Sequence, residues 1–508
     1  MKKTLLTLAA GFLFLTASAQ ENTTGIFSKS TDIGNPKTTG SSIYSPDDQS
    51  YTLKGSGYNI WFARDEFQYL FKPLKGDFIL TANFRFTGKG SNGHRKTGWM
   101  VRTSTDDDAL HISAVLHGDG LTVMQWRDSK GEEMKDPQDQ VFAKDSSYSV
   151  IQLERAGKII FMRAAKEGKP FENIGSYEMV NLPDEVLAGL FICSHDPEVS
   201  EEVSVWNVRI DKPVADNYSQ ARDGAVGCRL ETMTVADGKR KVIYEKQGRF
   251  EAPNWMNDGK KLLFNMDGLI NTIPVNGGEI AVLNTGTVKR NNNDHGISFN
   301  GKLLALSGSR EGAPGGSQVF VVPIEGGEPK QITDNTPSYF HGWAPNNKEV
   351  VYVAQRNGIP IYNIYRNSIK GGKEVKLTNL KEGEHVDGCE YSPDGKFIYF
   401  NASISGNMQL WRMKPDGTGM EQLTFDENKN WFPHISPDGK WIAYIAFPPD
   451  IEKNAHPANK RVTLRLMPAN GGEPKVIAYL YGGQGTINVP SWSPDSKQIA
   501  FVSNSGLK

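Results

Sequence analysis

The carboxy-terminal half of the chain repeats one pattern of hydrophobic and polar positions six times. Each repeat has a short alternating run, a turn, and a second run rich in branched and aromatic residues. The repeats span residues 254–264, 295–306, 341–353, 389–400, 434–445 and 491–502. The turns are of the type Pro393-Asp394-Gly395, in which proline presets φ and glycine supplies a positive φ. The pattern therefore predicts six β-hairpins.

Five of the hairpins are followed by a second pair of short strands, as in residues 409–413 and 421–424. Four strands per unit are typical of a propeller blade. The sixth unit ends after its first hairpin, whereas residues 230–235 and 241–245 have the pattern of an outer pair without an inner one. We therefore predict a six-bladed β-propeller over residues 228–503, in which the amino-terminal strands complete the last blade.

The amino-terminal half also alternates apolar and polar residues, but without this repeat. Strand patterns such as residues 78–86 and 203–210 follow one another between turn signals. This spacing predicts a two-sheet β-sandwich over residues 20–212, so that the whole chain is all-β. Residues 213–227 read as a polar linker without periodicity, and such a linker predicts some relative motion of the two domains.

Residues 1–19 predict a cleaved signal peptide, because Lys2 and Lys3 precede an apolar run at 5–15 and small residues at 17–19. No cysteine follows the cleavage site, so a lipid anchor is not indicated. No later stretch approaches transmembrane length. We expect a periplasmic or secreted protein without a transmembrane segment.

Charge and cysteine content narrow the partners and the redox chemistry. The chain has 57 basic and 58 acidic residues, so no global field attracts nucleic acid or an anionic membrane. The three cysteines, Cys193, Cys228 and Cys389, leave open one disulfide or three buried thiols. We favour three thiols, because an exported chain of 508 residues needs no disulfide framework.

Five motifs in the repeat region carry a resemblance to a known family. They are NNDHG at 292–296, SYFHGW at 338–343, NKNWFPH at 428–434, LRLMP at 464–468 and GGQGTINVPSWSPD at 482–495. With these motifs the region resembles the TolB-related propellers. The resemblance implies an exported ring that binds a ligand or acts as an enzyme.

The amino-terminal half carries a second resemblance, on GWMVR at 98–102, IQLERAG at 151–157 and VSVWNVRI at 203–210. These segments resemble jelly-roll domains of the concanavalin and laminin-G type. The resemblance implies either a carbohydrate-binding domain or a spacer.

Five histidines precede innermost strands of the predicted propeller or lie in the insertion of blade five. They are His295, His341, His385, His434 and His456. These positions share one face, where the innermost strands converge on the central channel. The same entrances and neighbouring loops carry Glu251, Asn293, Asp294, Tyr339, Asp387, Trp431, Gln484, Asn488, Arg310 and Arg356. Such a set around a concave mouth predicts a ligand-binding site.

One chemical interpretation of this set is a divalent cation such as Mn, Ca or Zn, held by His295, His341 and His434. Asp294 or Asp387 would add a carboxylate ligand, and Gln484 a neutral oxygen. The arrangement resembles the oligogalacturonate lyases, TolB-like relatives that hold manganese with histidines and a glutamine to eliminate acidic sugars. Their two ligating histidines are separated by one residue, and this chain has no His-x-His.

The other interpretation needs no metal. Asp294 beside His295, and Asp387 two residues after His385, would each orient an imidazole as a general base, with His341 close by. Trp431 would then stack on a sugar ring.

Three functions follow from these patterns. The first is an exported, carbohydrate-directed protein whose channel mouth binds a glycan, with the sandwich as an accessory recognition domain. The second is a carbohydrate-active enzyme, a lyase or hydrolase, that uses the histidine and aspartate cluster. The third is a TolB-like scaffold that binds a protein partner of the cell envelope.

Overall fold

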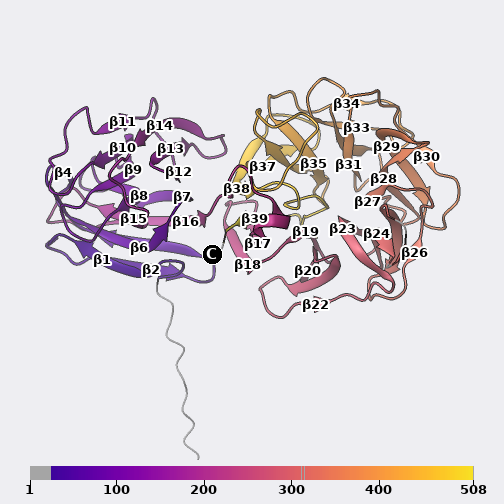
Figure 1. Cartoon of the computed structure of the whole chain (residues 1–508), viewed down its shortest axis with the longest axis horizontal. Helices are drawn as coiled ribbons and strands as arrows, with labels where there is room; N and C mark the ends of the chain where they lie inside the picture. The colour runs from indigo at the N-terminus through magenta and orange to yellow at the C-terminus, as the bar shows by residue number, and fades with distance from the viewer. Residues whose placement is uncertain (1–23, 311, 314, 507–508) are drawn as a thin grey trace, which may run out of the picture.

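The structure, a computed structural model, describes residues 24–310, 312–313 and 315–506. The predicted signal peptide, residues 1–19, lies outside the described residues. Two β-rich bodies lie side by side, one from each half of the chain (Figure 1). Within the described ranges, no helix is long and apolar enough to cross a membrane. The three cysteines are buried free thiols, as predicted.

The first body consists of two seven-stranded antiparallel sheets. One has the order β1 (Lys29–Ile33), β6 (Phe67–Lys75), β15 (Glu185–Cys193), β8 (Lys96–Arg102), β9 (His111–His117), β10 (Thr122–Arg127) and β11 (Gln140–Phe142). The other has the order β14 (Glu172–Glu178), β13 (Ile159–Ala165), β12 (Val150–Ala156), β7 (Phe78–Thr87), β16 (Glu201–Asp211), β3 (Ser50–Gly55) and β2 (Ser41–Ser45). This is the two-sheet arrangement that the alternation predicts.

Alternating apolar residues build the core between these sheets. Leu80 of β7 lies opposite Leu153 of β12, and both pack in one buried cluster with Trp99 and Leu190 of the other sheet. Because side chains of a strand alternate between faces, every second residue enters this core. The jelly-roll identity of the concanavalin and laminin-G type stays a prediction.

The opposite face of the first sheet is also covered. A short hairpin of β4 (Ile60–Trp61) and β5 (Arg64–Asp65) packs over it, and Ile60 joins a second apolar cluster with Met100 and Val115. Strands β8, β9 and β10 are consequently buried at every residue. The centre of this sheet is therefore covered on both faces.

The second body is a six-bladed propeller, as predicted. Blade one is β19 (Phe250–Trp255), β20 (Lys261–Met266), β21 (Leu269–Pro274) and β22 (Ala281–Val282); blade two is β23 (Val288–Ile297), β24 (Leu303–Arg310), β25 (Gln318–Pro323) and β26 (Lys330–Gln331). Blade three is β27 (Ser338–Trp343), β28 (Glu349–Arg356), β29 (Ile359–Ser368) and β30 (Val375–Lys376); blade four is β31 (Val386–Tyr391), β32 (Ile398–Ala402), β33 (Gln409–Met413) and β34 (Glu421–Gln422). Blade five is β35 (Lys429–Ile435), β36 (Trp441–Phe447), β37 (Lys460–Pro468) and β38 (Lys475–Gly482).

Blade six is assembled from both ends of the domain. Strand β17 (Gly227–Thr234) pairs with β39 (Gln498–Ser505), with Leu230 opposite Val502, and β18 (Arg240–Gln247) lies outside it. Trp492 forms an isolated bridge with Ile499 and supplies the innermost position. The pairing closes the ring as the sequence predicts.

The serine of the repeated turn explains why the repeat is so regular. Ser392 Oγ donates a hydrogen bond to Asp394 Oδ1 at 2.7 Å and accepts one from the Phe397 N–H at 3.1 Å. The same pair of contacts forms around Ser436 in blade five. Side chains within the turn thus satisfy its backbone and fix the hairpin.

The two bodies meet at blade six through buried charges. Glu231 of β17 is fully buried and pairs with Arg209 of β16 at 2.6 Å and Arg240 of β18 at 2.7 Å. Lys239 pairs with Asp48 of the sandwich at 2.6 Å. These contacts join the domains more firmly than the polar linker alone predicts.

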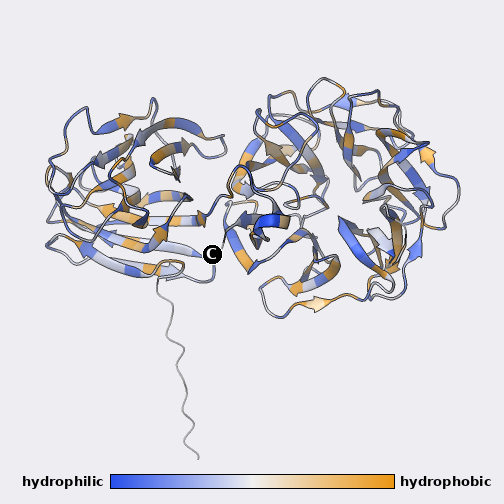
Figure 2. Cartoon of the chain, in the orientation of Figure 1, coloured by the Kyte–Doolittle hydropathy of each residue, from blue (hydrophilic) through white to orange (hydrophobic). Residues whose placement is uncertain are grey.

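The linker itself contains the short helix α1 (Gln220–Asp223), a hydrophilic turn with no buried residue (Figure 2). Its Gln220 reaches the propeller. The segment is therefore part of the propeller surface as well as a connection.

Candidate channel-mouth site

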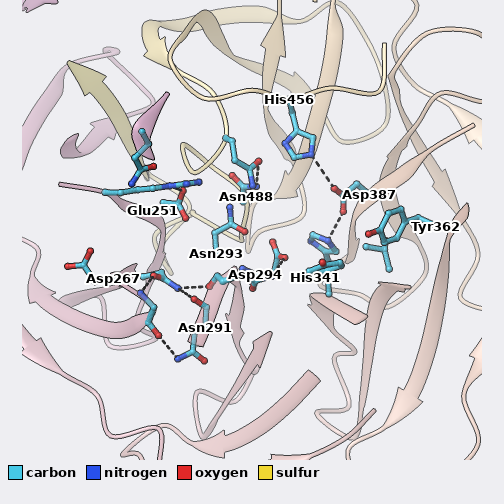
Figure 3. A pocket seen from close by; sticks show the side chains of 18 of the residues that line it. Glu251, Asp267, Asn291, Asn293, Asp294, His341, Tyr362, Asp387, His456 and Asn488 are labelled. Carbon is cyan, nitrogen blue, oxygen red and sulfur yellow. Dashed lines mark hydrogen bonds and ion pairs between the residues drawn. The ribbon is translucent and has the colours of Figure 1, made fainter. Parts of the chain in front are cut away.

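A cavity of about 610 Å³ opens where the innermost strands enter the propeller (Figure 3). It is lined by Gln220, Arg249, Glu251, Asn265, Asp267, Gly268, Asn291, Asn292, Asn293, Asp294, Tyr339, His341, Val353, Tyr362, His385, Asp387, His456, Gln484 and Asn488. Blades one to five and the segment before blade six all contribute. Charged groups and amides dominate the lining, so the cavity is polar.

A β-bulge near the entry of each innermost strand aims these side chains at the channel. In blade three, His341 is the extra residue between the pairs Phe340–Tyr352 and Gly342–Val351. In blade four the pairing shifts directly after Asp387. A bulge leaves one residue out of the ladder and bends the strand, which is how a side chain of a pleated strand turns into a channel.

Blade two has a longer bulge. Asn291 pairs with Gly308 and His295 with Leu306, so residues 292–294 oppose Ser307 alone. The bulge places Asn293 and Asp294 in the cavity lining. Asn265 holds it in place by donating to the backbone carbonyls of Asn291 at 2.8 Å and Asn292 at 2.6 Å.

His341 and Asp387 form a buried ion pair at the wall of the cavity. His341 Nε2 lies 2.6 Å from Asp387 Oδ1, and His456 Nε2 lies 3.9 Å from Asp387 Oδ2 (Figure 3). Burial lowers the pKa of His341, but the carboxylates of Asp387, Asp294 and Glu390 together outweigh burial and raise it, with Asp387 contributing most of the rise. In turn His341 holds the pKa of Asp387 well below its ordinary value despite burial. Burial lowers the pKa of His385 and His456, so these imidazoles are neutral at pH 7.

Asp294 lies next to this pair, near the centre of Figure 3. It is 7% exposed, and its carboxylate accepts one side-chain hydrogen bond, from Asn292 Nδ2 at 3.0 Å. Burial raises its pKa to about 7, with His341 opposing and the carboxylates of Asp387 and Glu251 adding to the rise. Asp294 therefore changes charge near neutral pH.

Glu251 and Arg249 pair on the blade-one side of the cavity. Burial raises the pKa of Glu251, and Arg249 partly offsets it. Gly485 packs directly against the side chain of Glu251, and only glycine fits there. A Cβ at Gly485 would lie 2.8 Å from Glu251 Cγ, and Gly485 has a φ of +91°. Its N–H donates to Asn488 Oδ1 at 2.7 Å, which orients that amide.

Ten of the residues predicted for the site line the cavity. They are Glu251, Asn293, Asp294, Tyr339, His341, His385, Asp387, His456, Gln484 and Asn488. They come from blades one to five and the segment before blade six, so the ring brings together residues more than 200 positions apart. Their roles in binding or catalysis remain proposals.

The predicted metal set is not brought together. His434 lies between blades, where Nδ1 contacts Glu390 Oε2 at 2.7 Å and Nε2 contacts the Ile487 carbonyl at 2.6 Å. Both its nitrogens are thus engaged by protein. His295 is fully buried outside the cavity lining. Of the three histidines predicted to bind a metal, His341 is the one that lines the cavity. Across the residues that the structure describes, no group of three or more His, Cys, Asp or Glu could hold a metal ion.

Three predicted binding residues also lie elsewhere. Trp431 is fully buried behind His456, whose ring centroid is 4.3 Å from its own, so it cannot stack on a sugar ring. Arg310 pairs with Glu328 at the outer side of blade two. Arg356 pairs with Glu374 at 2.6 Å, and its Nη2 donates to Ser338 Oγ at 2.8 Å. Both arginines hold blade strands together and do not line the cavity.

Sequence reasoning missed several residues of the cavity. Tyr362, at the start of the third strand of blade three, follows a connection that belongs to the same face, and this topology could have identified it. Arg249 directly precedes the innermost strand of blade one, and Asp267 lies in its connection between the second and third strands, so the same topology could have identified both. Gln220 comes from the linker, where no pattern pointed to a site.

The comparisons with known proteins concern the propeller. Residues 341–455 match the family PD40, the TolB beta propeller domain. Over 280 residues the chain is 39% identical to the uncharacterized protein Atu1656 of Agrobacterium fabrum, covering 55% of this chain and 93% of that protein. A solved structure described as "The structure of putative TolB from Agrobacterium tumefaciens" is 39% identical, with a TM-score of 0.52, and the match covers 55% of this chain and 99% of that one.

The chain is also similar to the Tol-Pal system protein TolB of Francisella tularensis subsp. tularensis, at 25% identity over 285 residues. That match covers 52% of this chain and 60% of TolB. The family match lies in the propeller, the part of the molecule that carries the cavity. On its fold, its repeat and these matches, the chain belongs to the TolB-like β-propeller family.

Proposed function

We propose that this protein is an exported scaffold of the cell envelope whose channel mouth binds a segment of a protein partner. The observation that carries the proposal is the polar, amide-rich cavity at the mouth of a propeller similar to TolB of the Tol-Pal system. Its volume falls in the range of about 300–1,000 Å³ that is usual for specific ligand sites.

The amide side chains of the lining suit a peptide. Asn293 carries an N–H donor and a carbonyl acceptor, which match the two groups of a peptide backbone. Gln484 and Asn488 are bonded to each other, with Asn488 Nδ2 donating to Gln484 Oε1 at 3.0 Å, and add two amides to the lining. Tyr339 and Tyr362 form an aromatic wall, with ring centroids 6.1 Å apart. Such a lining can satisfy an extended segment along its length and still select its side chains.

A carbohydrate ligand, the first function suggested by the sequence, finds less support. Its predicted stacking residue, Trp431, is buried, and the central strands β8, β9 and β10 of the sandwich are covered on both faces. The relatives reported above name no carbohydrate. The protein-binding proposal therefore fits the cavity and the relatives better.

A second candidate, acid–base catalysis on a ligand in the same cavity, is favoured by one observation. The His341–Asp387 ion pair and Asp294, whose pKa is about 7, lie together in the lining. A general acid and a general base near neutral pH are what such catalysis needs. This candidate predicts turnover that is lost in His341→Ala while the fold persists.

The test of the binding proposal compares a blocked mouth with an open one. The purified chain and its Asn293→Trp variant, which narrows the cavity with a larger side chain, are each used to capture partners from an envelope extract. Asn181→Trp, on the exposed surface of the sandwich, is the matched control. We expect one or more proteins to bind the wild type and the control but not Asn293→Trp. Equal capture by all three, or binding of glycans alone on an array, contradicts the proposal.

A further inference from the structure

One buried carboxylate of the cavity, that of Asp294, has no cationic partner among the residues that the structure describes. Asp387 is paired with His341 and Glu251 with Arg249, whereas Asp294 forms no salt bridge with any of the described residues. Its sole side-chain hydrogen bond comes from the neutral amide of Asn292. A buried carboxylate without a partner is costly, and proteins keep such groups mainly where a ligand completes them.

We propose that the ligand of the channel mouth carries a positively charged group, a lysine or arginine side chain or an amino terminus, that pairs with Asp294. This inference rests on the proposed function and names the chemistry of the segment that would bind. The pairing would replace the lost hydration of the Asp294 carboxylate by a charge-assisted hydrogen bond.

The groups that face Asp294 from the neighbouring blades do not supply that charge. His341 of β27 is already engaged by Asp387 of β31. His385 and His456 are neutral at pH 7, because burial lowers the pKa of each. Glu251 of β19 and Asp267 at the exposed rim add further carboxylates. An anionic ligand would therefore meet an unpaired carboxylate, and a cationic one would meet a complementary site.

The aromatic wall of Tyr339 and Tyr362 also favours a cationic ligand. The carboxylates of Asp294 and Asp387 act on Tyr339 and Tyr362, and after burial they contribute to raising the pKa of both phenols. The negative field of the carboxylates thus extends across the cavity to these rings. A ring face attracts a cation, which adds to the attraction of the carboxylate.

The experiment selects ligands without assuming their sequence. A random heptapeptide library is selected at pH 8 on the full chain, and binders are kept only if Asn293→Trp fails to bind them. We expect lysine or arginine to be enriched at one position, or a free amino terminus to be required. For each retained peptide, synthetic forms with lysine or arginine replaced by glutamine, and with the amino terminus acetylated, show which cation is bound.

Affinity is then measured by calorimetry for the wild type and Asp294→Asn. We expect Asp294→Asn to weaken binding of a lysine or arginine peptide about 10- to 100-fold at pH 8. In the wild type, affinity should rise about tenfold from pH 6 to pH 8 as Asp294 ionises, and in Asp294→Asn it should change much less. His341 and Glu251 lose protons in the same direction, and the variant measures their share. Asp47→Asn, an exposed carboxylate of the sandwich, is the matched control.

The possible outcomes distinguish a failure of the cation inference from a failure of the proposed peptide-binding function. Peptides that bind the mouth but lack a required cation, or that bind Asp294→Asn as tightly as the wild type, contradict the inference and leave the binding function standing. A library that yields no peptide sensitive to Asn293→Trp contradicts both. Thermal unfolding of Asp294→Asn shows that any loss of binding does not come from a loss of fold.

Discussion

Asp65 in the sandwich and Asp294 in the propeller are both buried aspartates, but their surroundings differ. Asp65 is fully buried and receives a bidentate pair from Arg127, at 2.8 and 2.9 Å, and a contact from Arg102 at 3.4 Å. Asp294 faces an open cavity and has one amide donor. Both aspartates are buried and contact polar groups, so the extent of burial alone does not distinguish their roles.

The difference shows how to tell a buried charge that holds the fold from one that serves a ligand. The guanidinium groups around Asp65 compensate its burial within the chain, and removing it leaves them unpaired. For Asp294 the compensation within the chain is incomplete, and removing its charge relieves a cost. The same Asp→Asn change should therefore have opposite effects on stability in the two domains.

The largest effect is expected for Asp65→Asn. Two fully buried arginines lose their counter-charge, which costs about 3–5 kcal/mol of unfolding free energy. Urea unfolding at pH 7 measures the loss. Asp106→Asn, which removes an exposed partner of Lys130, is the control and should leave stability unchanged. Similar losses in both variants would show that the burial of Asp65 is not what matters.

Glu231→Gln tests the charges between the two bodies. Arg209 and Arg240 lose a shared, buried carboxylate, so we expect a loss of about 3 kcal/mol and a separation of sandwich and propeller unfolding into two transitions. Differential scanning calorimetry resolves the transitions. A single transition at the wild-type temperature would mean that other contacts, such as Lys239 with Asp48, suffice to couple the domains.

Asp294→Asn should raise stability, by about 2 kcal/mol at pH 8. The folded pKa of about 7 lies above the ordinary value of 3.8, so the folded state holds this proton more tightly and the wild type loses stability as pH rises from about 4 to 7. The gain should thus reach less than half of its full size at pH 5 and be nearly complete at pH 8. Unfolding curves at pH 5 and pH 8 check it, and a loss of stability at both values would contradict the sign.

The smallest effect on stability is expected for Asp387→Asn, about 1 kcal/mol. The raised pKa of His341 contributes stability that is present below about pH 6.5 and is lost as pH rises through the folded pKa of this histidine. The depressed pKa of Asp387 contributes stability that is present only above about pH 4. The loss should therefore be greatest between these values. NMR titration of His341 gives the sharper test, since without Asp387 burial is opposed only by the smaller contributions of Asp294 and Glu390, and the pKa of His341 should fall.

Much of the fold could be predicted from the sequence because its signals are local. The serine, proline, aspartate and glycine of each turn satisfy one another within six residues, as Ser392 shows, so the repeat appears directly in the sequence. The closure of the ring followed from counting, since two outer strands stood at one end of the domain and two were missing at the other.

The site was harder to predict because bulges decide which side chains enter the channel. His295 and His341 each precede the turn position, Ser298 or Ala344, by three residues, yet only His341 lines the cavity. Three residues of blade two oppose Ser307 alone, whereas blade three has one extra residue, so equal spacing leads to different positions. A shift of one residue moves a side chain to the other face of a strand.

The buried charges were beyond sequence patterns for another reason. Asp65 is 37 residues from Arg102 and 62 from Arg127, and the contacts depend on a hairpin that folds back over the first sheet. The partner of Asp387, His341, comes from a neighbouring blade. Pairings over such distances follow from the tertiary structure and not from any local signal.

The seam of blade six has a consequence for how the protein can be divided. Strand β17 closes the ring by pairing with β39, and its Glu231 also receives Arg209 from the sandwich. Cutting the chain in the linker would yield a propeller whose closing strand retains a carboxylate but loses one of its two arginines. In an isolated propeller Glu231 and Arg240 would still pair with each other, so a design for crystallisation or fusion should neutralise both residues together or neither, because changing one alone would leave the other charge unpaired.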